Sequence, residues 1–237
     1  TNRKPYQKRE LEEGVLEQLL LSNTSDARAE IKLVTDKREM KTLADASSVM
    51  ERVALETEPI HKLFFESIVW TPQEEMERGM GLPIKATELP PPIQLLFRAI
   101  RHWRIANILN YVGLSLMASK ANAATYATGS ATGIILAERF DKFAYVEAGR
   151  VFERAWLIST LHGLAFQPVT GVLFLGRRLV AKQTEVFNAK HLPMIQKAYA
   201  TITTIFDTKE KVPAMLFRIG YADSPSARTI RKPPEIR

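Results

Sequence analysis

The chain contains 237 residues with a mass of 26.8 kDa, which is long enough to bury a core without disulfides or a structural metal. Hydrophobic residues make up 46% and charged residues 25%, a balance that excludes disordered, collagen-like and low-complexity proteins. There is no cysteine, which excludes a disulfide scaffold, a cysteine nucleophile, an iron–sulfur cluster and a thiolate zinc site. The formal net charge of +7 predicts a surface that attracts anions such as phosphate, nucleotides or nucleic acid.

The sequence carries no recognisable targeting signal. No apolar run approaches the roughly 20 residues of a membrane-spanning helix, so no transmembrane segment is predicted. Residues 1–6 lack both the apolar stretch of a signal peptide and an initiator methionine. We therefore expect a cytoplasmic protein that does not associate with membranes, and a chain that is a processed or truncated piece.

The first half of the chain alternates between regular and irregular patterns. Leucines at helical spacing predict a helix over residues 10–22, and alternating β-branched residues predict a strand over 29–35 before a helix over 37–69. Prolines and glycines then interrupt residues 70–92, which we expect to form a long lid or partner arm. The alternative is an ordinary surface insertion.

Residues 93–120 form the next helical pattern, with Arg98, Arg101, His102 and Arg104 on one side. This basic face suits nucleic acid, but arginine stems that cover apolar surface explain it better. Further along, we predict a strand over 128–138, helices over 142–162 and 182–206, a strand over 213–221 and an extended tail over 222–237. Since no repeat or linker is visible, residues 1–237 are expected to form one α+β domain.

Motifs for self-sufficient catalysis are missing. The four histidines lack partners at metal-ligand spacing, and there is no phosphate-binding glycine loop, nucleophile elbow or zinc-protease motif. We therefore predict no catalytic side chain and no metal site. An enzyme of this kind would need a cofactor to supply the reactive atoms.

Three separated segments resemble the FMN-dependent nitroreductase family. The first is Thr-Asn-Arg-Lys-Pro-Tyr at residues 1–6, which is similar to the family's opening motif. The resemblance implies that Thr1 and Arg3 hold the flavin phosphate or ribityl chain. A cation and a hydroxyl are suited to that task because both can bond to a phosphate oxygen.

The second segment, residues 149–171, resembles the family's long central helix, which ends in Gly-Leu and a short loop. The resemblance implies that the loop lies against the isoalloxazine ring, with its amides facing the reactive edge. The ring neighbours would be Gln167, Pro168, Val169, Thr170 and Gly171. The alternative is an ordinary buried helix with a glycine near its end.

The third segment joins residues 217–221 to residues 228–233 and resembles the family's closing strand and trailing basic motif. It implies that Arg228 and Arg231 bind the flavin phosphate, with Lys232 behind them. A solvated basic tail is the alternative.

The chain also departs from the family pattern. The motif that normally contacts flavin early in the chain is absent between Ser22 and Ile31, and Glu153-Arg154 replaces a Gln-Asn pair. These losses, with Trp-Thr-Pro-Gln-Glu at residues 70–74, resemble a divergent branch in which two nitroreductase-like halves share a chain. The implied fold is α+β, with a central mixed or antiparallel sheet flanked by helices and a lid-like insertion.

The resemblance implies an FMN-binding oxidoreductase that passes electrons from NAD(P)H to an undetermined small-molecule acceptor. Its site would be shared in a homodimer, or in a pseudo-dimer with a second nitroreductase-like half. The alternative is a non-catalytic subunit of the same fold that binds or sequesters flavin or serves in assembly. A nucleic-acid-binding domain that uses the basic face is the least favoured hypothesis.

Overall fold

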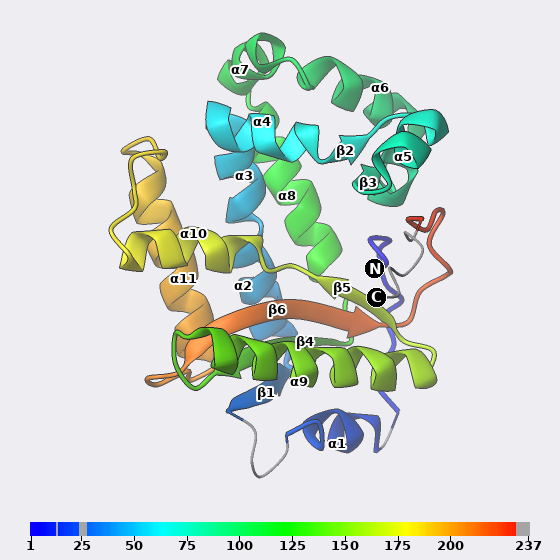
Figure 1. Ribbon diagram of the computed structural model, residues 1–237, viewed down its shortest axis with the longest axis vertical. Helices are drawn as coiled ribbons and strands as arrows, with labels where there is room; N and C mark the ends of the chain where they lie inside the picture. The colour runs from blue at the N-terminus through cyan, green and yellow to red at the C-terminus, as the bar shows by residue number, and fades with distance from the viewer. Residues whose placement is uncertain (13, 24–27, 231–237) are drawn as a thin grey trace, which may run out of the picture.

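A four-stranded antiparallel sheet forms the centre of the computed structural model, which describes residues 1–12, 14–23 and 28–230 (Figure 1). The strand order is β1-β4-β6-β5, and all three pairings are antiparallel. The strands are β1 (Ala29–Val34), β4 (Ala131–Ala137), β6 (Val212–Gly220) and β5 (Ala165–Pro168). The α+β class and the antiparallel sheet agree with the sequence prediction.

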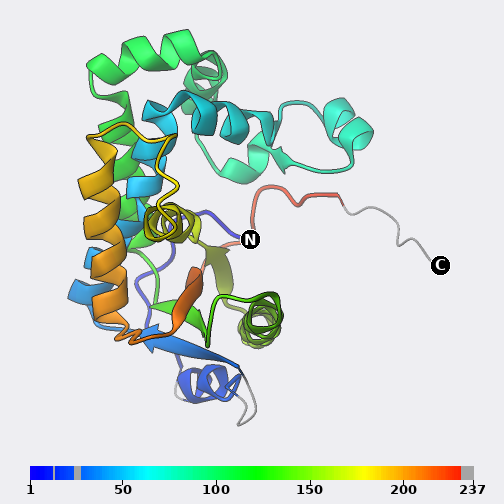
Figure 2. The ribbon, with the colours of Figure 1, turned by 60° about the vertical axis from the view of Figure 1, so that its left-hand side comes forward.

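Helices cover both faces of this sheet, as Figure 2 shows. On one face, α9 (Lys142–Leu161) and α1 (Val15–Leu20) pack against Ile135 and Phe217. On the other face, α2 (Lys37–Ser47), α10 (Gly171–Val180) and α11 (His191–Ile205) pack against Ile134 and Leu216. Since neighbouring residues of a strand point to opposite faces, the continuous apolar run of β4 fills both halves of the core.

The helix predicted over residues 37–69 is divided into α2, α3 (Val49–Glu56) and α4 (Glu58–Glu66), followed by the short strand β2 (Ile68–Val69). The break before α4 has a local cause. Thr57 is extended, with φ −128° and ψ 108°, and Pro59 occupies the first turn of α4, where its missing N–H costs nothing.

Residues 70–92 are more regular than the sequence pattern suggested. They contain α5 (Pro72–Arg78), β3 (Leu82–Pro83), which pairs in parallel with β2, and the 3-10 helix η1 (Ile84–Thr87). The helix α5 is capped at Thr71, because the Thr71 hydroxyl accepts the amide hydrogen of Glu74 at 3.1 Å. In Figure 1 this segment stands above the N-terminus.

Two further predictions need correction. The helical pattern over residues 93–120 is three helices, α6 (Pro91–Ile100), α7 (Trp103–Tyr111) and α8 (Leu114–Tyr126). The helix expected from residue 182 begins only at His191, while α10 lies before it and was not expected. The chain leaves α10 through Lys182, which has a left-handed φ of 57°.

Asn23 protects the outer edge of β1. Its side-chain oxygen accepts the Ile31 N–H at 2.6 Å, and its side-chain nitrogen donates to the Ile31 carbonyl at 3.2 Å. No helix among the described residues is long and apolar enough to cross a membrane.

Candidate functional site

The N-terminal segment lies along the end of the sheet formed by β5 and β6. The Asn2 N–H donates to the Phe166 carbonyl at 3.0 Å, and the Gln7 N–H donates to the Tyr221 carbonyl at 2.8 Å. The Tyr6 hydroxyl donates back to the Asn2 carbonyl at 2.9 Å. These bonds bring the first and second segments of the family resemblance together.

Arg218 of β6 anchors this arrangement from inside. Its side chain is buried, with the residue 1% exposed, and Nε donates to Oε1 of Gln167 at 2.8 Å. Its other nitrogens donate to the carbonyls of Thr125 at 2.5 Å and Lys4 at 2.7 Å, and the guanidinium lies 3.8 Å from the centre of the Tyr6 ring. Arg218 therefore joins the N-terminal segment to β5 and to the end of α8.

The charge of Arg218 has no carboxylate partner among the described residues, because its four hydrogen bonds there go to neutral oxygens. Burial lowers its pKa, and the nearby phenols of Tyr6 and Tyr126 act against that change. Burial also raises the pKa of Tyr6 to about 12, so this phenol is neutral at physiological pH. A buried cation without an anion is costly, and an anionic ligand would reduce that cost.

Arg3 supplies a second guanidinium near the same phenols. It donates to the Thr1 hydroxyl at 3.0 Å and to the Ala86 carbonyl of η1 at 3.3 Å. Burial lowers the Arg3 pKa, while Tyr126, Tyr6 and Glu88 oppose the shift. No ion pair joins Arg3 to a carboxylate in the described part of the chain.

The C-terminal tail passes beside the N-terminus, as Figures 1 and 2 show. The Asn2 side chain donates to the Asp223 carbonyl at 2.7 Å, and the Lys4 ammonium donates to the Ser224 carbonyl at 2.7 Å. Burial, then Arg3 and then Arg228 lower the pKa of the Thr1 amino group, so the charges of both arginines act on Thr1. Arg3 thus contacts Thr1, and Arg228 lies on the tail between Ser226 and Ile230, whose amides donate to Glu88 and Glu75.

Arg231, the remaining phosphate candidate, lies outside the described residues. We use the name cationic cluster below for Arg3, Arg218 and Arg228.

Residues 167–171 are held to β6 largely by their own polar groups. The Val169 N–H donates to the Leu216 carbonyl at 2.8 Å, and the Thr170 hydroxyl both donates to that carbonyl and accepts the Leu216 N–H. Gln167 turns inward to Arg218. Pro168 ends β5 and is half-buried.

Gly171 begins α10 at a close approach to α3: a methyl group added there would lie 2.6 Å from Cγ of Met50. Packing therefore explains this glycine. The role of residues 167–171 as neighbours of a flavin ring remains a prediction.

A buried acid lies beside the cationic cluster. The Tyr126 hydroxyl donates to Oε1 of Glu51 at 2.5 Å, and Oε2 is buried without a hydrogen-bond partner in the described part of the structure. Burial raises the pKa of Glu51 to about 7, against hydrogen bonds that lower it. Because the acid is largely protonated below pH 7, it only partly offsets the positive charge of the cluster.

Sequence reasoning missed Arg218, Asn2 and Tyr126. The sequence did contain a signal for Arg218, since it is a lone charge inside the apolar strand Ala-Met-Leu-Phe-Arg-Ile-Gly. Such a residue is rarely buried without a specific partner. Among the described residues, no group of three or more histidine or acidic side chains is placed to hold a metal ion.

Comparison with solved structures identifies the architecture. The chain superposes on the FMN-dependent nitroreductase NfnB from Mycobacterium smegmatis, crystallised with NADPH, with a TM-score of 0.51, 12% identity and coverage of 99% of this chain and 89% of that one. An oxidized iodotyrosine deiodinase bound to FMN and 3-iodo-L-tyrosine gives a TM-score of 0.50, 12% identity and coverage of 100% and 93%. The chain has a nitroreductase-like fold. The resemblance found in the sequence is thus confirmed at the level of the fold.

No family model matches the sequence. One similar protein, an uncharacterized protein of Mycobacterium tuberculosis (strain CDC 1551 / Oshkosh), is 21% identical over 216 residues. The match includes 90% of this chain but only 30% of that protein's length.

Proposed function

We propose that this chain is an FMN-binding oxidoreductase of the nitroreductase type. The observation that carries the proposal is the cationic cluster: Arg3 donates to the Thr1 hydroxyl, the charge of Arg228 acts on the Thr1 amino group, and the buried charge of Arg218 has no anionic partner among the described residues. These groups fit a phosphate, because guanidinium forks and a hydroxyl form charge-assisted hydrogen bonds with phosphate oxygens. The FMN-bound and NADPH-bound structures of similar fold support the same choice of ligand.

Each part of the chain has a distinct role in this proposal. Thr1, Arg3 and Arg228 hold the phosphate, with Arg231 further along the tail. Arg218 positions the N-terminal segment through its bond to Lys4, and residues 167–171 form the wall beside the ring. When bound, the flavin supplies the hydride chemistry between NAD(P)H and an acceptor, so no protein nucleophile is required.

The insertion at residues 70–92 is proposed to act as the lid of this site in a single domain of residues 1–237. The insertion contacts both the N-terminal segment and the C-terminal tail. Ala86 accepts a hydrogen bond from Arg3, and Glu88 accepts hydrogen bonds from the Ser226 amide and hydroxyl at 2.6 Å. A closed lid excludes water from the site.

A second subunit or half is proposed to complete the protein. The outer face of α9 exposes Phe143, Val146, Leu157 and Leu161, with exposures of 56% to 80%. Large apolar side chains gathered on one helix favour an interface. Either a homodimer or a pseudo-dimer would bury this apolar face of α9. A cytoplasmic location is proposed as well, because it fits reduction by NAD(P)H.

The visible absorption spectrum tests the cofactor. Protein purified without added flavin is expected to show a flavin spectrum, or to acquire one when FMN is added and the excess removed. Anaerobic addition of NADPH should then bleach the flavin absorbance. A colourless protein that retains no FMN would refute the proposal.

The alternative, a protein that binds flavin without turnover, draws support from the lid contacts. Two glutamates of the insertion bind the tail: Glu88 accepts from Ser226, and Glu75 accepts from the Ile230 N–H at 3.1 Å. Protein that holds FMN but is not bleached by NADPH would favour this alternative. The variant Glu88→Gln weakens the hydrogen bonds to Ser226, so NADPH should then bleach the flavin. The exposed control Glu39→Gln on α2 should leave the flavin unbleached.

A further inference from the structure

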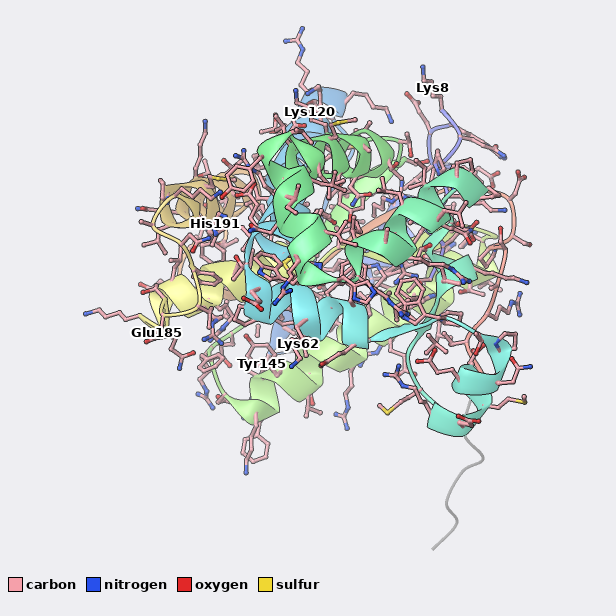
Figure 3. The ribbon with its side chains drawn as sticks, turned by 90° about the horizontal axis from the view of Figure 1, so that it is seen from above. Lys8, Lys62, Lys120, Tyr145, Glu185 and His191 are labelled. Atoms are coloured by element: carbon pink, nitrogen blue, oxygen red, sulfur yellow. The ribbon has the colours of Figure 1, made fainter. Side chains whose placement is uncertain are left out.

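A second pocket lies away from the cationic cluster, between α4 and the junction of α6 and α7. It has a volume of about 370 Å³ and is open to solvent on one side. Phe65, Trp70 and Trp103 form its apolar walls. Figure 3 labels Lys62, the exposed α4 residue that also lines it. No step of the function proposed above uses this pocket.

His61 gives the pocket a hydrogen-bond acceptor. The residue is 1% exposed, and its Nε2 lies 2.8 Å from the Ile100 carbonyl, which can only accept, so Nε2 carries the hydrogen. Burial lowers the pKa of His61, which keeps the imidazole neutral and leaves Nδ1 as an acceptor. In the described part of the chain no group donates to Nδ1. The rings of Phe65 and Trp103, at 4.5 and 5.2 Å, hold the imidazole in place.

The aromatic walls select for a flat ligand. Trp70 is half-buried and lies parallel to Phe65 at a centroid distance of 6.3 Å, and Phe97 packs against both. These side chains form a small apolar cluster with Leu55 and Ile100. Because these neighbours hold the indole ring in place, the ring offers a rigid apolar surface against which an aromatic ligand can pack.

Arg101 supplies a cation at the opening. Its guanidinium lies 5.8 Å from the Trp70 ring, and it forms no ion pair with any described carboxylate. Two of the nearby acids have other cations as partners: Glu66, which also lines the pocket, pairs with Lys62 at 4.0 Å, and Glu74, whose pKa Arg101 helps to lower, pairs with Arg78 at 2.9 Å. The remaining acid, Glu58, favours protonation of His61 but is outweighed by burial.

We propose that this pocket binds a planar aromatic carboxylate whose ring carries a hydrogen-bond donor. The ring stacks on the tryptophan walls, the ring hydroxyl or N–H donates to Nδ1 of His61, and the carboxylate binds Arg101. The inference does not depend on flavin binding, so it can fail while the proposed function stands, and the reverse also holds.

Calorimetric titration with three probes tests the assignment on the full chain. We expect 4-hydroxybenzoate, which has both groups, to bind about tenfold more tightly than benzoate, which lacks the donor, or phenol, which lacks the carboxylate. Equal affinities for the three probes, or no saturation by about 10 mM 4-hydroxybenzoate, would overturn the proposal.

Two variants locate the site without disturbing the core. Arg101→Gln should weaken 4-hydroxybenzoate about tenfold and leave phenol unchanged, because only the carboxylate contact is lost. The matched control Arg104→Gln alters an exposed arginine of α7 that does not line the pocket, and it should bind like the parent. In a Trp156→Phe background, binding should quench the fluorescence of Trp70 and Trp103. Equal weakening by both arginine variants would indicate non-specific charge attraction and refute the site.

Discussion

Two buried charged regions of this protein differ in how completely their charges are satisfied. At the end of α3, the Glu56 carboxylate accepts hydrogen bonds from Arg52, Ser115, Lys190 and His191 at 2.6 to 2.9 Å. Burial alone would raise the pKa of Glu56, but these donors outweigh it and lower the pKa to about 2. The Glu56 carboxylate therefore has all the partners it needs within the chain. Its hydrogen bonds join α3 to α8 and α11.

The cationic cluster is the opposite case. Arg218 and Arg3 are bonded to neutral carbonyls and hydroxyls, and burial lowers the pKa of both. The Glu56 site is complete within the chain, whereas the cationic cluster has donors and charge left for a ligand. Perturbed ionisable groups therefore mark both structural joints and binding sites, and the completeness of their partners distinguishes the two.

The largest expected effect is on the free energy of unfolding, when the Glu56 site is changed. Glu56→Gln removes the charge that holds four donors, so we expect the free energy of unfolding to fall by about 3 kcal/mol. Urea denaturation at pH 7 measures it. The exposed neighbour Glu58→Gln should change the value by less than about 0.5 kcal/mol. A similar loss in both variants would show that the Glu56 network is not special.

A change in the cationic cluster should alter the affinity for the ligand and leave the stability of the protein almost unchanged. Arg3→Gln is expected to weaken FMN binding by about 1.5 to 3 kcal/mol, roughly ten- to hundredfold, with little change in the unfolding of the ligand-free protein. Flavin fluorescence titration measures the affinity. Lys8→Gln changes an exposed cation of the same segment and serves as the control (Figure 3). Unaltered affinity in Arg3→Gln would remove Arg3 from the phosphate site.

The pH dependence of stability separates the two acids of α3. The Glu56 pKa of about 2 lies below its ordinary value of 4.5, so the unfolded chain binds more protons and stability rises with pH between these values. The Glu51 pKa of about 7 lies above 4.5, so the folded chain binds more protons and stability falls between pH 4.5 and 7. Glu51→Gln should flatten the second slope alone. A variant that keeps this slope would contradict the assignment.

The smallest effect is expected at Arg228. Because this side chain is exposed, solvent screens its charge, and Arg228→Gln should weaken FMN by less than about 1 kcal/mol, or about fivefold. The titration used for Arg3→Gln measures it. If Arg228→Gln had the larger effect, the tail and not the N-terminal segment would be the main phosphate contact.

The sequence predicted the elements whose patterns were long or strictly periodic. The strands at β1 and β6 and the helix α9 fall within a residue or two of the expected bounds. The break at Thr57 was missed although the sequence carries a signal for it, since Thr57-Glu58-Pro59 places a proline in the first turn of a new helix. The short apolar runs of β5 and α10 carry no decisive period.

The candidate site was predictable only through resemblance. The motifs at the two chain ends pointed to Thr1 and Arg3, which are in contact, and to Arg228, whose charge acts on Thr1; their role in binding phosphate stays a prediction. Arg218 was missed because the function of a buried arginine depends on partners far away in the sequence, such as Lys4 and Thr125. No periodicity encodes such contacts.

The covered sheet edges have a consequence for self-assembly. An exposed strand edge is a template on which other chains add strands and grow into fibres. Here the amide of Asn23 copies the bonds of a neighbouring strand at Ile31 of β1, and the Asn2 N–H occupies the Phe166 carbonyl of β5. Because these edge groups already have partners, two copies of this chain are less able to join their sheets edge to edge. Contacts between copies are then expected to form through the helices. One asparagine at each border thus directs association away from open-ended growth and toward closed assemblies.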